Sequence, residues 1–363
     1  MRLTRSRWLV SSALLFVALA ARAETRPHYG GTLRIETQQA ITAVPADADG
    51  GASPLSRQIA RLLFDDQRGA KAGSGPFKIT EFVAGKKLTL TANDDFRQGR
   101  PYLDSIEILM GRSPREQRVD FQLGRADVID VPVDGLRRAA QEGVPVVASA
   151  PIELVAIVFS ANGAGGDSES GAKVREAISL SADRAAIFNV LTGRQGEPTA
   201  ALVPNWISGY GFLFDTGQNT TRAKQLAVEA GRAKPLTLAY DPQDGLAKSI
   251  AERVSLDARA AGLVVLPSPA VGAPDARVVR ILIPYEDPRD VLAWLPAMLG
   301  GKAPTAQSPE EQFAAEKRLR DELRVVPLLH LPVANGLAPR VKDWNRTKSG
   351  AWSLESVWLE QRP

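Results

Sequence analysis

Residues 236–267 hold the pattern that most restricts the fold of this 363-residue chain. An apolar, β-rich segment, LTLAYD (236–241), precedes the helical pattern LAKSIAERVSLDARAAG (246–262) and a second short apolar segment, LVVLP (263–267). Strand, helix and strand in this order indicate a parallel βαβ crossover. We therefore expect an α/β protein.

The other segments divide the chain into a strand-rich first half and an α/β second half. The first half holds a short strand (32–36), an amphipathic stretch (55–64), a hairpin (78–94), a strand (105–111) and a helix closing at Gly124. The apolar run 153–162 has no polar face, so we expect a central strand there. For the second half the periodicity predicts helices at 173–181, 183–193, 221–231, 288–299 and 309–324 and strands at 278–284 and 326–333.

The first 23 residues have the composition of a secretory leader. MRLTRSR carries three arginines and no acid, and the uncharged run Trp8–Ala21 follows it. Ala21-Arg22-Ala23 then offers the small residues of a cleavage site. The run is shorter than the roughly 20 residues that a helix needs to cross a bilayer. We expect a cleaved signal peptide at 1–23 and, in a bacterium with two membranes, a periplasmic protein.

The leader also accounts for the basic charge. The chain has 45 Lys and Arg against 41 Asp and Glu, and four of the arginines precede Glu24. The remaining chain is neutral, so no general field attracts phosphates or acidic lipids. No cysteine occurs, which excludes disulfides, thiolate metal sites and a lipid anchor on a cysteine. We expect a free, monomeric protein that binds no nucleic acid.

Motifs for catalysis are absent from the sequence. It has no nucleophile elbow, phosphate loop, dinucleotide fingerprint or zinc-protease helix. Of its two histidines, His28 follows the leader and His330 lies in an apolar strand, where packing is the simpler role. Adjacent acids such as Asp94-Asp95 point apart and indicate a solvated face. We expect no enzyme, cofactor or metal site, and an exported hydrolase has no supporting constellation.

Several segments carry motif residues at fixed spacings. They are GGTLRIE (30–36), GSGPFKITEFVAGKKLTLTANDDFRQGRPYLDSIEI (73–108), FQLGRADVIDVP (121–132) and KVREAISLSADRAAIFNVLTGRQGEPTAALVP (173–204). The motif residues of the last segment are Val174, Arg175, Ala177, Ile178, Asp183, Arg184, Ile187, Gly193, Gly196, Pro198 and Pro204. In this order the segments resemble the extracytoplasmic solute-binding proteins of family 5, the dipeptide-, oligopeptide- and nickel-binding type that serves ABC importers.

This resemblance implies a two-lobed, type II periplasmic-binding-protein fold. Lobe I would comprise 24–155 with a return segment, 334–363, and lobe II would comprise 156–333. A small molecule or short peptide would be held in the interlobe cleft and delivered to an ABC permease in the inner membrane. The implied function is solute binding for peptide or oligopeptide transport.

The sequence departs from the family at two places. Members usually have a large subdomain between the opening strand and the Gly-x-Gly-Pro turn, where this chain has only residues 37–72, so most of it is missing. In peptide-binding members an aspartate at a strand end pairs with the ligand's ammonium, and the matching position in ILIPYEDP (281–288) is Pro284. The alternative is therefore a reduced paralogue that does not transport and acts as a sensor or interaction protein.

Candidate ligand-binding residues lie in the loop 204–214 and around the strand end at 284. Aromatic rings there offer flat apolar area, and a nearby carboxylate offers charge. The candidates are Trp206, Tyr210, Phe212, Tyr285, Asp287 and Trp294. Packing in the core or a loop is the alternative for each ring.

Overall fold

The computed structural model describes residues 26–47, 53–65, 73–231, 235–269 and 272–360, so the expected signal peptide lies outside the described residues. The strands are β1 (Thr32–Glu36), β2 (Phe77–Val83), β3 (Lys87–Ala92), β4 (Ser105–Leu109), β5 (Val128–Asp130), β6 (Val146–Phe159), β7 (Glu197–Pro198), β8 (Leu236–Tyr240), β9 (Val265–Pro269), β10 (Ala276–Leu282), β11 (Val325–Leu337), β12 (Val341–Lys342), β13 (Asn345–Arg346), β14 (Trp352–Ser353) and β15 (Trp358–Leu359). The helices are α2 (Pro54–Leu63), α3 (Pro114–Gln122), η1 (Val133–Gly135), α4 (Leu136–Gln141), α5 (Glu169–Ser181), α6 (Arg184–Ala186), η2 (Ile187–Leu191), α7 (Asn205–Ser208), η3 (Gly211–Leu213), α8 (Thr220–Glu229), α9 (Gly245–Ala260), α10 (Pro288–Met298) and α11 (Pro309–Glu322).

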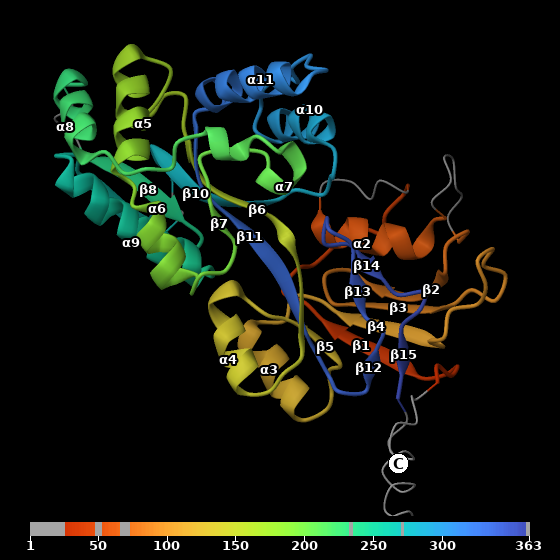
Figure 1. Ribbon diagram of the computed structural model, residues 1–363. Helices are drawn as coiled ribbons and strands as arrows, with labels where there is room; N and C mark the ends of the chain where they lie inside the picture. Colours follow the sequence, from red (N-terminus) through yellow and green to blue (C-terminus); the bar gives the residue numbers. More distant parts are fainter. Residues whose placement is uncertain (1–25, 48–52, 66–72, 232–234, 270–271, 361–363) are drawn as a thin grey trace, which may run out of the picture.

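Within these residues one 11-stranded sheet runs through the molecule (Figure 1). Its order is β2-β3-β4-β1-β5-β11-β6-β10-β8-β9, with β7 paired to β11. The expected βαβ crossover is confirmed, because β8 and β9 pair in parallel and α9 buries Ile250 and Val254 in the core beside them. The mixed α/β fold expected from the sequence is therefore the one observed.

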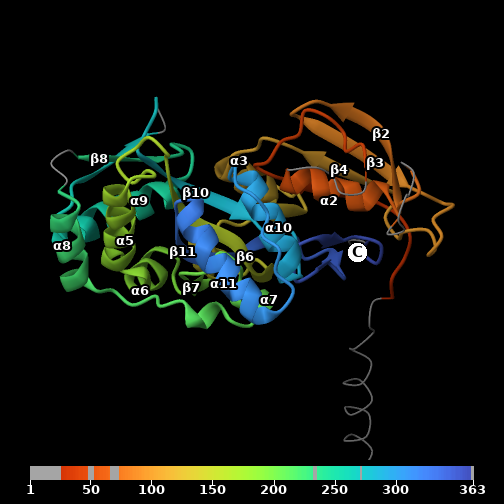
Figure 2. The same cartoon turned by 90° about the horizontal axis from the view of Figure 1, so that it is seen from above.

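The sheet has two halves, joined by the long antiparallel strands β6 and β11. We call β1–β5 the N-terminal half and β8–β10 the C-terminal half. Each half has a core of its own: Leu33 and Ile106 pack with Ile59 of α2 in one, and Leu238 packs with Ile250 of α9 in the other. Figure 2 shows the helices gathered mainly around the C-terminal half, with α2 beside the N-terminal half. The two cores are thus separate in space and are linked through two shared strands.

Several helices begin where a side chain satisfies the free amides of the first turn. Ser113 of α3 and Ser308 of α11 each form a capping box with a glutamate three residues on. Asp183 caps α6, as the sequence indicates, through a bond from the Ala186 amide. The helix expected over 183–193 nevertheless changes after one turn into the π-helical η2.

The central strands are longer than the apolar pattern indicates. β6 begins at Val146 rather than near 153, and β11 continues to Leu337 rather than ending at 333. The early part of β6 is half-buried and contains Pro151, so no continuous apolar run marks it. Two of the three register shifts between β6 and β11 fall at Pro332, where the strands pass from one half of the sheet to the other.

No helix in the described ranges is long and apolar enough to span a bilayer.

Candidate functional site

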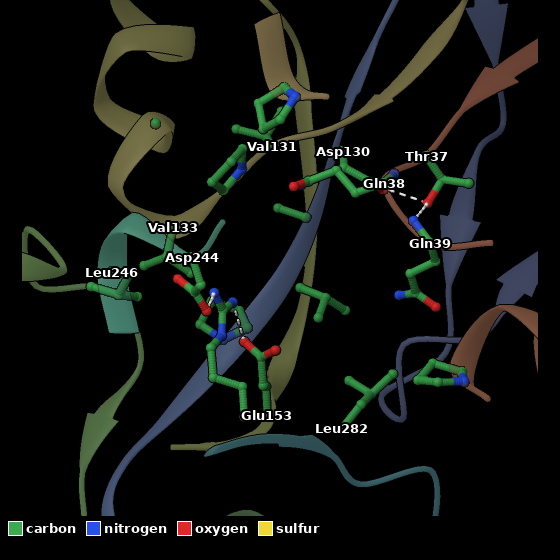
Figure 3. Close-up of a pocket in the computed structure, with 18 of the residues that line it drawn as sticks. Thr37, Gln38, Gln39, Asp130, Val131, Val133, Glu153, Asp244, Leu246 and Leu282 are labelled. Atoms are coloured by element: carbon green, nitrogen blue, oxygen red, sulfur yellow. Dashed lines mark hydrogen bonds and ion pairs between the residues drawn. The ribbon is translucent and has the colours of Figure 1, made fainter. Parts of the chain in front are cut away.

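A cavity of about 570 Å³ lies where the two halves of the sheet meet (Figure 3). The residues that line it from the N-terminal half and its helices are Thr37, Gln38, Gln39, Pro54, Leu55, Gln58, Pro114, Arg118, Asp130, Val131, Pro132, Val133, Asp134, Gly135 and Arg138. Those from β6, the C-terminal half and the returning chain are Glu153, Asp241, Gln243, Asp244, Gly245, Leu246, Arg280, Leu282, Pro332, Val333, Ala334, Arg346 and Trp352. A volume of this size suits a small ligand.

The topology brings these residues together. β1 and β5 run parallel, and so do β8 and β10, so each pair ends at one edge of the sheet. Residues 37–39 and 131–135 follow β1 and β5, and residues 241–245 follow β8. Ligands of open α/β sheets bind outside such carboxyl ends. The cavity therefore occupies the position where this type of fold holds ligands.

On the N-terminal side Asp130 anchors the cavity wall. Its Oδ2 accepts hydrogen bonds from the Thr37 hydroxyl at 2.8 Å and the Gln38 amide at 2.9 Å, and its Oδ1 accepts one from Asn335 at 3.4 Å. Burial raises the pKa of Asp130, although these bonds oppose the effect. Arg346 donates from Nε to Asn335 Oδ1 at 2.9 Å, and burial lowers the pKa of its guanidinium to about 10. This carboxylate already has its partners within the protein.

On the opposite wall Arg280 of β10 lies between two carboxylates. Its Nη2 is 2.6 Å from Glu153 Oε2, and its Nη1 is 3.0 Å from Asp244 Oδ2. Burial alone would lower the pKa of Arg280, but the two carboxylates raise it above its ordinary value. Asp244 also caps α9 by accepting the Ala247 amide at 3.0 Å. The triad is therefore held from three elements: β6, β10 and the start of α9.

Two contacts join the halves beside the cavity. The guanidinium of Arg57 on α2 lies 5.3 Å from the ring centre of Trp294 on α10, a cation–π geometry. Glu286, after β10, accepts the Ser349 amide of the returning chain at 3.1 Å. Both contacts link surfaces that would separate if the halves opened.

The six residues selected from the sequence do not line this cavity. Trp206 donates from its indole to the Pro151 carbonyl at 2.9 Å, and Phe212 is 72% exposed. Tyr210 is buried and meets Phe313 edge-on with ring centres 5.8 Å apart. Trp206 lies in α7, Phe212 lies in η3 and Tyr210 lies between them, and no residue of 204–214 lines the cavity.

The other three lie after β10. Tyr285 and Trp294 pack edge to face at 5.8 Å, and both touch the core under α10. Asp287 caps α10 and pairs with Arg289 at 2.5 Å. The structure brings Tyr285 and Trp294 together, and Trp294 reaches the boundary between the halves through Arg57. That these six residues bind the ligand stays a prediction.

The sequence reasoning missed Glu153, Asp244 and Arg280. One signal was available, because Arg280 is the charge that interrupts the otherwise apolar strand VVRILIP. A charge in such a strand needs a buried partner or a function. Its partners come from β6 and from the start of α9, and only the fold shows this.

Both histidines have packing partners within the protein. His330 is fully buried and its Nε2 lies 3.1 Å from the Leu202 carbonyl, and His28 packs edge-on against Trp358. Packing, the role expected for His330, is what the structure shows. In the part of the chain that the structure describes, no three His, Cys, Asp or Glu side chains gather in a way that could hold a metal ion.

Comparison with known proteins agrees with this geometry. The family model of the bacterial extracellular solute-binding proteins, family 5 (middle region), matches residues 32–278, more than half of the chain. The chain belongs to this family. The resemblance and the two-lobed fold inferred from the motif segments are thus confirmed, and family 5 consists of substrate-binding proteins.

Individual family 5 proteins resemble the chain at modest identity. The oligopeptide-binding protein AppA of Bacillus subtilis is 28% identical over 165 residues, covering 44% of this chain and 30% of that protein. Di/tripeptide-binding protein 2 of Pseudomonas aeruginosa is 26% identical over 238 residues, covering 61% of this chain and 43% of its own length. The chain thus spans less than half the length of these curated relatives.

The solved structure of Bacillus subtilis AppA in complex with a nonapeptide shares the fold. Its TM-score is 0.71 at 15% identity, covering 93% of this chain and 100% of that one. The two-lobed solute-binding architecture is thus present in this family 5 protein. The segment 37–72, where most of the family's extra subdomain was expected to be missing, contains one described helix, α2.

Proposed function

We propose that the protein is the periplasmic solute-binding component of an ABC importer of the peptide and oligopeptide type. The observation that carries this proposal is the cavity of about 570 Å³, whose walls come from both halves of the sheet. A ligand that touches both walls stabilises the closed arrangement, which a permease can distinguish from the open one. The proteins of similar sequence are named as oligopeptide- and di/tripeptide-binding, which supports this transport class.

The proposed lobes are 24–155 with 334–363 and 156–333. The separate cores of the two sheet halves support this division, and β6 and β11 would act as the hinge. A cavity shared by both lobes favours transport over the reduced, non-transporting paralogue. The protein would act as a monomer, and it would bind its solute without catalysing a reaction.

Export would follow cleavage after Ala23, since Arg2, Arg5 and Arg7 precede an apolar run and Ala21-Arg22-Ala23. No cysteine is available in the sequence to carry a lipid. The protein would therefore be free in the periplasm and would meet its permease at the inner membrane.

A thermal-shift screen of protein isolated from the periplasm tests the proposal. The panel should include short peptides, amino acids, oligosaccharides and metal chelates, and the intact mass of the same sample reports whether it begins at Glu24. A solute at one hundred times its Kd should add about 2.7 kcal/mol to the free energy of unfolding. A panel in which no solute raises the unfolding temperature would speak against the transport function.

A further inference from the structure

We propose that the cavity takes a neutral polar solute, whose buried end offers hydroxyl or amide groups, and that Arg280 excludes a free ammonium from that end. The inference rests on the proposed function and specifies the chemistry of its ligand. It depends on how the charges that line the cavity are already paired.

Three carboxylates of the cavity lining, those of Asp130, Glu153 and Asp244, are occupied by the protein's own donors. Asp130 accepts from Thr37, Gln38 and Asn335. Asp244 uses one oxygen for the Ala247 amide and the other for Arg280. A ligand ammonium entering here would have to displace a donor that the fold has already placed.

Arg280 stands where such an ammonium would be expected, between Glu153 and Asp244. Of these three side chains its own is the most exposed, at 28% against 14% and 21%, so it is the most accessible of the three to a ligand. A guanidinium has five N–H donors, and the bonds to the two carboxylates use two of them. The rest can donate to a ligand oxygen, in an orientation that the carboxylates fix in advance.

The charged side chains of the lining nearly balance. They are four arginines and five acids: Arg118, Arg138, Arg280, Arg346, Asp130, Asp134, Glu153, Asp241 and Asp244. Such a lining suits a ligand without net charge. The triad of two carboxylates and one guanidinium carries one excess negative charge, which disfavours an anion, while Arg280 repels a cation at contact distance. Elsewhere in the lining the side chains of Gln38, Gln39 and Gln243 carry both donors and acceptors. Such amides pair with hydroxyl groups of a sugar or with amide groups of a blocked peptide.

Isothermal titration of the exported protein with three probes distinguishes a ligand with a free ammonium from a blocked peptide and from a sugar. The probes are trialanine with free termini, N-acetyl-trialanine amide and the trisaccharide maltotriose. We expect the blocked peptide or the trisaccharide to bind at least tenfold more tightly than free trialanine, and the stronger of the two identifies the source of the neutral groups.

Substitutions at Arg280 test whether this residue sets the preference. Arg280→Gln leaves Glu153 and Asp244 without their cation. The ammonium of free trialanine can then form charge-assisted hydrogen bonds with these carboxylates in place of the lost guanidinium. The affinity for free trialanine should therefore rise at least tenfold and exceed that for the blocked peptide. Arg280→Lys keeps the charge and should keep the wild-type order. Arg277→Gln, on the same strand but outside the cavity lining, is the matched control, and it should change neither the affinity for free trialanine nor that for the blocked peptide.

The outcomes distinguish this inference from the proposed function. Free trialanine binding the wild type as tightly as the blocked peptide would overturn the inference and leave solute binding intact. An unchanged order in folded Arg280→Gln would also overturn it. A wild-type protein that binds none of the three probes at millimolar concentration would count against both.

Discussion

Replacing Arg184 by methionine should lower the free energy of unfolding by about 3 to 5 kcal/mol. The side chain is 2% exposed and donates to three backbone carbonyls: Ser179 at 2.8 Å, Thr199 at 3.0 Å and Pro327 at 2.9 Å. These carbonyls come from α5, from the segment after β7 and from β11. Methionine fills much of the space but donates nothing, so the carbonyls would be left buried without partners.

Urea denaturation followed by circular dichroism measures this loss. Arg222→Met is the matched control, because Arg222 is 44% exposed and forms a surface ion pair with Glu229, so its loss should cost less than about 1 kcal/mol. Equal destabilisation by the two substitutions would show that the buried arginine does not hold these elements together.

The second large effect is a dependence of stability on pH that originates at Glu316. This carboxyl belongs to α11 and is fully buried. Burial raises its pKa to about 7, while the hydrogen bonds that it accepts from the Val203 and Leu202 amides oppose the rise. Between about pH 4.5 and 7 the unfolded chain releases this proton before the folded chain does. The free energy of unfolding should therefore fall by about 3 kcal/mol as pH rises through this interval, because a shift of one pKa unit corresponds to about 1.4 kcal/mol.

Glu316→Gln should remove that fall, since its amide oxygen still accepts the same N–H groups and carries no proton to lose. Unfolding free energies at pH 5 and pH 8 give the slope directly. Part of the wild-type slope should remain in the variant, because burial, with a smaller effect from Asp120, also raises the pKa of Glu36 to about 7. Glu311→Gln serves as control: backbone N–H groups of Gln307 and Ser308 lower the pKa of Glu311, so the slope above pH 5 should not change. A wild-type stability that rises from pH 5 to pH 8 would contradict this assignment.

Local periodicity predicts most of the secondary structure here, because each element buries one face. The crossover over 236–267 is an example: its apolar spacing changes from strand to helix and back, and the structure follows. Periodicity fails at the start of β6, where none of the residues 146–151 is fully buried. There the pairing with β11 decides the conformation, and no local pattern records a partner so distant in the sequence.

The candidate site was harder to predict than the fold. Residue type alone indicates aromatic rings as ligand-binding candidates. In the structure the ring of Tyr210 packs against Phe313, and the ring of Tyr285 packs against Trp294. The polar lining of the cavity comes from short segments after strand ends, such as Gln38 after β1 and Asp244 after β8. These strands belong to opposite halves of the sheet, and only the fold brings their carboxyl ends together at the cavity. A sequence shows that a side chain can bind, but the direction in which it points depends on tertiary packing.

Small-angle X-ray scattering of the exported protein tests most directly whether two lobes close on a solute. The sample is titrated with whichever solute stabilises it most in the thermal screen. We predict that the radius of gyration decreases in proportion to the bound fraction and reaches its minimum at one solute per chain. A scattering curve that does not change from the free protein to saturation would contradict closure of the lobes around the cavity.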